Sequence, residues 1–407
     1  MKIAILTLGS RGDIQPYIAL GQALKQQGHQ VTLSTAKNFE NLVIESQINF
    51  IPIEADYQAI LQSDEGKRIM NNNFLAIKQN LNKSIFPIIQ QSLDIFYKLA
   101  NDSDKVIYHI KTMADCFADQ FPEKMIRAMV VPAIQPTKEF LNPALSGLAI
   151  PSFLNKYSYY FNTLAIKMLS TPIKQFRKNN GLPIKYKLPN TKFIYGISEH
   201  FLAKPKDFPK NSIFTGFWFK NSNKELSPEL LQFIQSDEPP LILTFGSMLV
   251  NSKFNLLKAI IQLTKQLNIK IIVIKGWGFD KIELLENQPN IKVINEAPYE
   301  KLFPYAKAII HHGGIGTTAE CLRAGKPFMI CPIMYPIGDQ YFWGMLSFKK
   351  GLSLKPVPLK KLTEDKFISN IKNLIKNKTL LKNAQQIKNL IDNENGIMNA
   401  IQEIEKT

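Results

Sequence analysis

The sequence predicts an α/β protein with two domains, each a doubly wound parallel sheet of the Rossmann type. Near the N-terminus, an apolar run at residues 3–8, a helical pattern at 14–27 and a second apolar run at 31–34 follow one another. A strand, a helix and a strand in so short a stretch indicate a βαβ unit with parallel strands. The same alternation begins again at residue 241, and 407 residues suit two domains of roughly 100–200 residues each.

The elements of the N-terminal half are read from their apolar patterns. The first run, residues 3–8, is continuously apolar, which suits a strand buried on both faces. The helix that follows carries Ile14, Ile18 and Leu24 at helical spacing, and Gly28 stands where a helix terminator is expected. The rest of this half is expected to hold helices at 68–100, broken near Pro87, and strands at 106–110 and 129–132.

Residues 148–170 mix aromatic with polar side chains, among them Phe153, Tyr157 and Tyr160. The commoner arrangement for such a segment is an amphipathic helix that packs its apolar face on its own domain. A surface turned toward a membrane or toward an acceptor molecule is the alternative. The sequence leaves both interpretations open.

A boundary is expected after residues 214–218, because the polar stretch 220–226 and the stretch 237–240 have linker composition. The second series of elements comprises strands at 241–245, 270–274, 291–294, 308–312 and 327–331 and helices at 253–267 and 317–324. The predicted organisation is an N-terminal domain at 1–216, a linker at 217–240, a C-terminal domain at 241–390 and a helix at 391–407 that packs back on the N-terminal domain.

Composition excludes several classes of protein. The chain has 50 Lys and Arg against 33 Asp and Glu, a formal net charge of +17, but the lysines are scattered and no nucleic-acid-binding motif is visible. Its three cysteines lack the spacing of a zinc site or a disulfide framework, which fits a reducing compartment. No run approaches the ~18 apolar residues that span a bilayer. We therefore expect a cytoplasmic protein without nucleic-acid partners. Peripheral association with a membrane surface stays open.

The most informative stretch is residues 308–320, a buried strand, a glycine-rich turn and the start of a helix. Glycines let a backbone approach a ligand closely, and the helix N-terminus favours a diphosphate. Residues 314–319 also fit the loose dinucleotide fingerprint GxGxxA. A dehydrogenase would need an acidic residue at the end of the next strand, whereas that strand ends at Cys331-Pro332. The dehydrogenase interpretation is therefore disfavoured.

The same stretch resembles the donor-binding signature of the UDP-glycosyltransferase superfamily. The matching residues are His311-His312-Gly313-Gly314-x-Gly316-Thr317, then Gly325-x-Pro327, Pro332 and Asp339-Gln340-x-x-Trp343-Gly344. Residues 9–16, Gly-Ser-Arg-Gly-Asp-Ile-Gln-Pro, resemble the opening of the branch with sterol glucosyltransferases and glycopeptide- or macrolide-type bacterial enzymes. The resemblance implies a GT-B fold with two domains facing across a cleft, a UDP-sugar donor, no metal or other cofactor, and inversion at the anomeric carbon.

Donor-side roles follow from the resemblance, position by position. It implies that His312, Gly314 and Thr317, within the turn that includes Gly316, hold the diphosphate and that Glu320 binds the ribose hydroxyls; the alternative for Glu320 is a solvated residue paired with Arg323. Asp339 and Gln340 would contact the sugar. Ser247 would lie near the phosphates, and Ala297 and Pro298 beside the base, with Trp277 either stacking on the base or filling a loop.

On the acceptor side, Asp13 is the candidate catalytic base, at a turn from strand to helix expected to face the cleft. Asp is also a favoured helix-capping residue, and both roles can hold together. Family members often have a histidine near this place, which this stretch lacks. Ser10, and Thr137 with Phe140 by a weaker similarity, are expected on the acceptor side. Asp102-Ser103-Asp104 matches a metal-binding DxD, but it precedes its strand and is expected to be a loop.

The predicted function is transfer of a hexose from a UDP-sugar to a hydroxyl of a small hydrophobic acceptor, such as a sterol, lipid or polyketide-like alcohol. An epimerase of UDP-sugars with the same fold is the first alternative, although only five histidines are present. A catalytically silent partner protein is the second. The sugar and the acceptor stay open, because acceptor pockets are built from loops, here residues 50–100 and 133–175.

Overall fold

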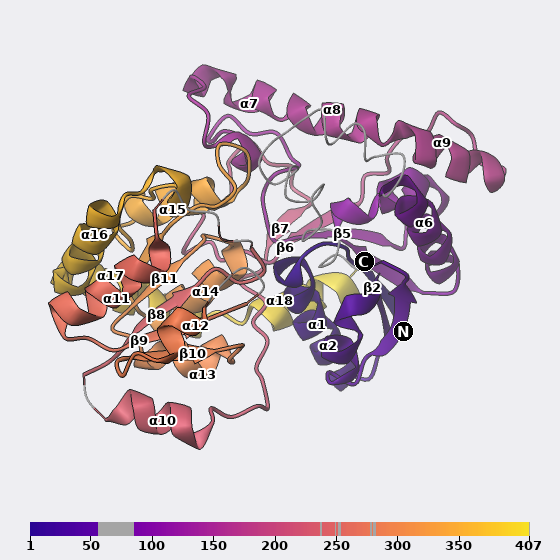
Figure 1. Cartoon of the computed structure of the whole chain (residues 1–407). Coiled ribbons are helices and arrows are strands. Elements are labelled where there is room, and N and C mark those ends of the chain that lie inside the picture. The colour runs from indigo at the N-terminus through magenta and orange to yellow at the C-terminus, as the bar shows by residue number, and fades with distance from the viewer. Residues whose placement is uncertain are drawn as a thin grey trace. The chain divides into compact units, whose positions relative to one another are not determined.

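The computed structural model divides the chain into two compact units, each with its own parallel sheet (Figure 1). Unit 1 comprises residues 1–142, 150–220 and 395–407, and unit 2 comprises 143–149 and 221–394. The structure describes residues 1–55, 85–236, 238–248, 250, 254–276, 279 and 282–406.

The sheet of unit 1 has, within the described residues, seven parallel strands in the order β3-β2-β1-β4-β5-β6-β7. Its inner strand β1 is buried from Ile3 to Leu6 without alternation, as expected for a strand covered on both faces. The strands are β1 (Lys2–Leu6), β2 (Gln30–Ala36), β3 (Asn49–Ile53), β4 (Lys105–Tyr108), β5 (Met125–Met129), β6 (Lys192–Tyr195) and β7 (Ser212–Phe214).

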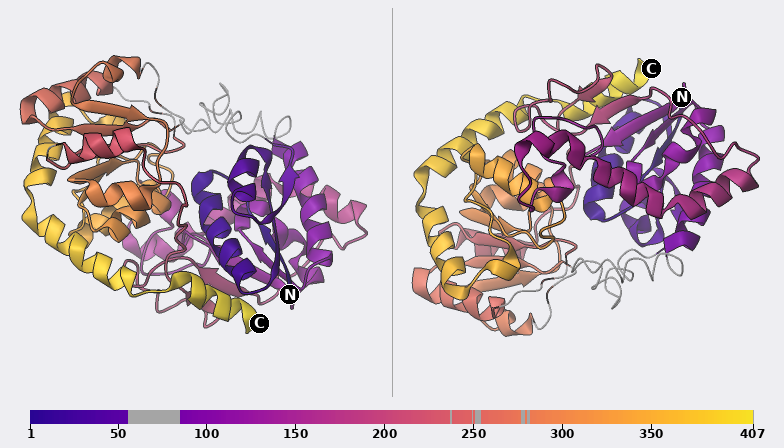
Figure 2. Two further views of the ribbon diagram at one scale, coloured as in Figure 1. Left: turned by 90° about the horizontal axis from the view of Figure 1, so that it is seen from below. Right: turned by 90° about the horizontal axis from the view of Figure 1, so that it is seen from above.

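Helices flank this sheet, and both ends of the chain belong to this unit. Helix α1 packs against α18, the last helix of the chain, and Figure 2 shows the yellow α18 beside the indigo α1. The α-helices of unit 1 are α1 (Arg11–Gln26), α2 (Glu40–Ile44), α6 (Phe86–Asn101), α7 (Asn155–Ser158), α8 (Tyr160–Met168), α9 (Ser170–Asn179) and α18 (Gly396–Glu405). Its 3-10 helices are η1 (Lys37–Phe39), η3 (Ile110–Thr112), η4 (Ala114–Gln120) and η6 (Ser152–Leu154).

Unit 2 contains a parallel sheet of five strands, within the described residues, in the order β10-β9-β8-β11-β12. The strands are short and almost wholly apolar, so they form the centre of the core. They are β8 (Leu241–Thr244), β9 (Ile271–Ile274), β10 (Ile291–Ile294), β11 (Ala308–His311) and β12 (Phe328–Ile330).

Two sets of helices cover the second sheet. Residues of α11, α12 and α16 share one apolar cluster with its strands, whereas α14 packs with α13 and α17. The α-helices are α10 (Pro228–Gln235), α11 (Leu256–Leu267), α12 (Glu283–Glu286), α13 (Tyr299–Leu302), α14 (Ile315–Ala324), α15 (Gln340–Lys349), α16 (Glu364–Lys376) and α17 (Lys378–Asp392). The 3-10 helices are η5 (Pro143–Leu145), η7 (Phe303–Tyr305) and η8 (Leu359–Lys361).

The strand expected at residues 129–132 is wrong: the strand here is β5, Met125–Met129. A buried charged residue in its middle, Arg127, hides it from an apolar pattern. The Arg127 guanidinium donates to Asp115 Oδ1 at 2.8 Å and to Thr191 Oγ1 at 2.6 Å, so the charge is compensated inside the unit.

The borders between the units differ from those expected from composition. Unit 2 takes in residues 143–149 as well as its main part, which begins at Asn221. Part of the expected linker forms α10, whose N-cap Ser227 accepts a hydrogen bond from the Leu230 amide. The polar composition of this stretch belongs to a capped surface helix and its flanks.

Candidate functional site

The carboxyl ends of β8, β9 and β11 lie at one edge of the sheet in unit 2, and the turns that follow them pack closely. A Cβ on Gly276 would lie 2.1 Å from the carbonyl oxygen of Gly246, and a Cβ on Gly246 would lie 3.3 Å from His312 Cε1. The half-buried Ser247 is in the turn after β8, next to Gly246. The sheet therefore gathers these three glycine-containing turns at the position where α/β folds bind ligands.

The two adjacent histidines of this edge have different environments. His311, the last residue of β11, is fully buried, and its Nδ1 accepts from the Gly313 amide at 3.1 Å. His312 is half-buried, and its ring stands at 89° to that of His311. Burial lowers the pKa of His312 to about 4, so at neutral pH its ring is an uncharged hydrogen-bond donor. Its Nδ1 has no hydrogen-bond partner among the residues that the structure describes.

The His312 ring lies against the N-cap residue of helix α14. A Cβ on Gly314 would be only 2.5 Å from His312 Nε2, so a larger residue at 314 would displace the imidazole. Gly314 is also the N-cap of α14 and offers no side chain to its first amides. Next to it, a Cβ on Gly316 would meet no atom within 4 Å. The start of α14 therefore combines amides without a side-chain cap, a neutral imidazole and open space, a combination suited to an anion.

Glu320 lies one helical turn after Gly316, on the same face of α14. It is 8 % exposed, so the alternative of a solvated residue is wrong, although its Oε2 lies 3.8 Å from Arg323 Nη1. Burial raises the pKa of Glu320 to about 8, with Arg323 opposing that rise. Glu320 and Arg323 line a pocket together with Glu300, Pro304, Ala324, Lys388 and Asp392.

Asp339 and Gln340, predicted to contact the sugar, begin helix α15. Asp339 Oδ2 accepts from Trp343 Nε1 at 2.8 Å. Gln340 is buried, and its Oε1 accepts from the amides of Ile333 and Met334 at 2.8 and 2.9 Å. The Gln340 oxygen is thus committed to the loop after β12, which leaves its NH₂ group for a ligand.

The remaining donor-side residues are placed as follows. Thr317 is buried in the first turn of α14. Ala297 and Pro298 are half-buried after β10, with Pro298 as the N-cap of α13. Trp277 lies outside the described residues, so no contact is assigned to it.

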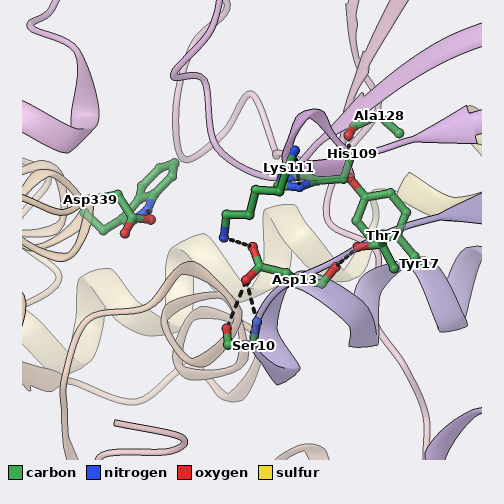
Figure 3. Close-up of polar contacts among 9 residues, drawn as sticks. Thr7, Ser10, Asp13, Tyr17, His109, Lys111, Ala128 and Asp339 are labelled. Atoms are coloured by element: carbon green, nitrogen blue, oxygen red, sulfur yellow. Dashed lines mark hydrogen bonds and ion pairs between the residues drawn. The ribbon is translucent and has the colours of Figure 1, made fainter. Parts of the chain in front are cut away.

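In unit 1, Asp13 lies in the first turn of α1 and is held on both oxygens (Figure 3). Its Oδ2 accepts from the amide and hydroxyl of Ser10 at 2.9 and 3.0 Å, and its Oδ1 accepts from Lys111 Nζ at 2.6 Å. The side chain is 14 % exposed. Burial raises the pKa of Asp13, but Lys111, His109 and Ser10 outweigh it, so the net shift is downward. Asp13 is therefore both a helix-capping residue and an ionised carboxylate.

Two residues beside Asp13 were missed by sequence reasoning, His109 and Lys111. They follow β4, which pairs with β1, so the parallel sheet brings them to the turn that carries Asp13. His109 is buried edge-to-face against Tyr17, and its Nδ1 accepts from the Lys111 amide at 3.3 Å. Burial lowers the pKa of His109 to about 4, against the opposing effect of Asp13. The strand expected at residues 106–110 includes His109, whereas β4 ends at Tyr108 and His109 lies in the turn after it.

The weaker acceptor-side candidates have mainly structural contacts. Thr137 is fully buried, and its hydroxyl donates to Asp207 Oδ1 at 2.6 Å and accepts from the Glu139 amide at 3.0 Å. Phe140 is half-buried in the same loop. The Asp102–Asp104 stretch is a loop, in which Asp104 accepts from the Lys2 amide at 2.7 Å.

Two features are absent from the residues that the structure describes. No group of three or more His, Cys, Asp or Glu side chains in that part of the chain is arranged to hold a metal ion. Over the same residues, no helix has the length and apolar character needed to cross a membrane.

Comparison with known proteins gives matches in both halves of the chain. Residues 3–113 match the N-terminal domain of glycosyltransferase family 28, and residues 263–402 match the C-terminal domain of proteins like erythromycin biosynthesis protein CIII. Sterol 3-beta-glucosyltransferase UGT80B1 of Arabidopsis thaliana is 26 % identical over 98 % of this chain and 67 % of its own length. The sterol 3-beta-glucosyltransferase of Debaryomyces hansenii is 29 % identical over 99 % of this chain and 26 % of its own length.

A solved structure supports the fold over the whole chain. The glycosyltransferase VinC, in complex with dTDP, superposes with a TM-score of 0.70 at 16 % identity, covering 100 % of this chain and 99 % of that one. The two parallel sheets, the β11–α14 turn and these matches show that the chain belongs to the UDP-glycosyltransferase superfamily, in the branch of the sterol glucosyltransferases and macrolide-type enzymes, with the GT-B fold.

Proposed function

We propose that this glycosyltransferase moves a hexose from UDP-sugar to the hydroxyl of a hydrophobic alcohol of the sterol, lipid or polyketide type, with inversion. The observation that carries the donor half is the start of α14, where His312 lies against Gly314 and no side chain caps the helix. The acceptor class is taken from the sterol glucosyltransferases that match nearly the whole chain.

The chemistry proposed for the donor is stabilisation of a leaving diphosphate. The acceptor oxygen attacks the anomeric carbon, the bond from that carbon to the phosphate oxygen breaks, and UDP leaves with the electron pair. The amides at the start of α14, the His312 N–H and the helix dipole would meet the developing negative charge. Ser247, Thr317, Asp339 and the Gln340 amide would orient the donor. We expect this reaction to proceed without a metal ion, and excess chelator to leave it unchanged.

The chemistry proposed for Asp13 is acceptance of the hydroxyl proton. A carboxylate offers about four lone-pair positions, and Ser10 and Lys111 occupy three. Its lowered pKa makes Asp13 a weak base. This suits a displacement in which the hydroxyl becomes acidic only as its oxygen bonds to the anomeric carbon.

Removal of Lys111 is expected to shift the pH dependence of transfer. Lys111 helps to hold the pKa of Asp13 below its usual value, and the proposed base must be ionised to act. Activity is lost as the pH falls through the pKa of Asp13, so in Lys111→Met the acid limb of the kcat/KM profile moves to higher pH.

The matched control is Lys37→Met. Lys37 resembles Lys111 in exposure, 55 % against 53 %, and it too forms an ion pair, with Glu54 at 3.1 Å. Lys37→Met should leave the acid limb in place. Identical profiles for wild type and Lys111→Met would show that Asp13 does not govern this limb.

We infer from Glu320 that UDP binds more tightly than dTDP. A carboxylate can accept hydrogen bonds from both ribose hydroxyls, whereas deoxyribose offers one. An unpaired buried polar group costs about 1–3 kcal/mol, roughly ten- to hundredfold in affinity. The superposed VinC holds dTDP, so the preference has to be measured on this chain. Calorimetric titration of both nucleotides is the measurement, and equal affinities would remove Glu320 from the ribose site.

The same carboxyl predicts a pH dependence of nucleotide binding. The pKa of Glu320 is about 8 without ligand, and accepting two hydroxyl donors requires the ionised form. UDP affinity should therefore rise with pH up to about 8 and then level off, with release of a proton below that pH. In Glu320→Gln this dependence should vanish, whereas Glu283→Gln, at an exposed position of α12, should retain it.

The proposed acceptors partition into membranes, so we also propose that the enzyme works in the cytoplasm with peripheral contact with a lipid surface.

A further inference from the structure

The consecutive helices η6, α7 and α8 carry an apolar stripe on the outside of unit 1. Its members follow one another at intervals of three or four residues, so they share one helical face. The stripe consists of Phe153 (76 % exposed), Tyr157 (63 %), Tyr160 (70 %), Leu164 (61 %) and Met168 (37 %). Tyr157 and Tyr160 stack at a centroid distance of 6.4 Å. Figure 1 shows α7, α8 and α9 running nearly end to end along unit 1.

The opposite face of the same helices attaches them to the unit, through the buried Tyr159 (3 % exposed) and through polar side chains. Asn155 Nδ2 donates to the Lys138 carbonyl at 2.9 Å, Ser158 Oγ accepts from the Asn142 amide at 2.9 Å, and Asn162 Oδ1 accepts from Asn142 Nδ2 at 3.1 Å. A surface helix normally buries its apolar side and exposes its polar side. Here the segment packs on its own unit as expected, but apart from Tyr159 most of its large apolar side chains lie on the outward face. An exposed contiguous apolar face marks an interaction surface.

The segment that carries this stripe is basic, although Asp207 from another loop lies near enough to Lys156 to act on it. Residues 150–198 contain eight Lys and Arg and no Asp or Glu. Arg177 pairs with Asp119, and Lys192 with Glu403. The other six are exposed lysines, namely Lys156, Lys167, Lys174, Lys178, Lys185 and Lys187. An apolar stripe in a segment that has six exposed lysines and no acidic residue of its own is complementary to an anionic, partly apolar partner.

We propose that the α7–α8 stripe (Phe153, Tyr157, Tyr160, Leu164 and Met168) docks on an anionic lipid bilayer, which names the surface for the membrane contact included in the proposed function. The tyrosine rings and Leu164 enter the interface between headgroups and acyl chains, where aromatic side chains with a polar end are favoured. The lysines contact anionic headgroups. A second copy of the chain is a poorer partner, because six exposed lysines on each copy would face one another.

The test is co-sedimentation with vesicles of phosphatidylcholine alone or mixed with phosphatidylglycerol, without donor or acceptor. The full chain should bind the anionic vesicles and hardly bind the neutral ones. Tyr157→Ser/Tyr160→Ser/Leu164→Ser should weaken binding at least about tenfold, roughly the factor that burial of one Leu-sized side chain supplies. The matched control removes three exposed apolar residues elsewhere, as Ile44→Ser/Leu284→Ser/Leu390→Ser, and should bind as wild type does.

Charge is tested separately with Lys156→Gln/Lys167→Gln. Each lysine near an anionic surface contributes about a fivefold factor to the affinity for vesicles, so this variant should bind more weakly than wild type. Added salt should remove that difference. Lys258→Gln/Lys382→Gln, which changes two exposed lysines of unit 2, is the control.

Three results would overturn the docking proposal. They are equal binding to neutral and anionic vesicles, wild-type binding by the triple serine variant, and a concentration-dependent dimer, seen by sedimentation, that this variant abolishes. The test is independent of the reaction. The triple variant should still glycosylate an alcohol dissolved in detergent, and vesicle binding without any transfer activity would refute the proposed function while leaving the docking surface in place.

Discussion

Asp13→Asn is expected to lower the rate of transfer to an alcohol acceptor by about 10²–10⁴-fold, the usual loss when a general base is removed. Asparagine has nearly the same shape, but its amide cannot take up the proton. Nucleotide affinity should be unchanged, because Asp13 is not among the residues proposed to bind the nucleotide. Steady-state kinetics with a fixed acceptor, together with UDP titration, make the measurement.

Two comparisons separate catalysis by Asp13 from its role in helix α1. Ser10→Ala removes one of the hydrogen bonds to Asp13 and leaves the carboxylate, so it should cost far less activity. Asp94→Asn alters an exposed carboxylate of α6 and should have no effect. A wild-type rate in Asp13→Asn would reduce Asp13 to a capping residue and require another proton acceptor.

His312→Ala is expected to lower turnover by about 10²–10³-fold, the usual cost of losing one donor to a developing negative charge. The pKa of His312 is about 4, so its contribution is that of a neutral donor, and the loss should be the same throughout the neutral range. His311→Ala is the adjacent control. His311 is fully buried with its Nδ1 bonded to Gly313. His311→Ala should therefore lower the melting temperature, and it should cost less turnover than His312→Ala.

Turnover and thermal unfolding should therefore separate the two histidines. Equal losses of turnover in variants that are equally folded would show that the wrong histidine is assigned to the diphosphate. A loss in His312→Ala that grows as the pH falls from neutral would contradict the neutral-donor assignment.

Much of the fold could be predicted from the sequence, because the strands of both sheets are short apolar runs between helical patterns. The strand predicted at 291–294 has the bounds of β10, and those at 241–245 and 308–312 differ from β8 and β11 by one residue. Strand β5 was misplaced because a buried arginine, compensated by Asp115 and Thr191, looks like a surface residue in an apolar pattern.

The candidate site could be predicted where its residues are consecutive, as in the turn from His311 to Thr317. Contacts between distant segments were beyond the sequence. Lys111 is 98 residues from Asp13, and their ion pair depends on β1 lying beside β4. Likewise, a sequence pattern does not show which face of α7 and α8 is outward, because it is polar contacts from Asn155 and Asn162 that help hold their inward face to the unit.

The most direct test of the account is incubation of the enzyme with labelled UDP-glucose and a panel of hydrophobic alcohols, with products identified by mass spectrometry and by NMR of the anomeric proton. The account predicts a glycoside of at least one such alcohol, with the anomeric configuration inverted from that of the donor, and release of UDP in equal amount. Conversion of the sugar nucleotide to an epimer without an acceptor, or a glycoside that keeps the donor configuration, would contradict it.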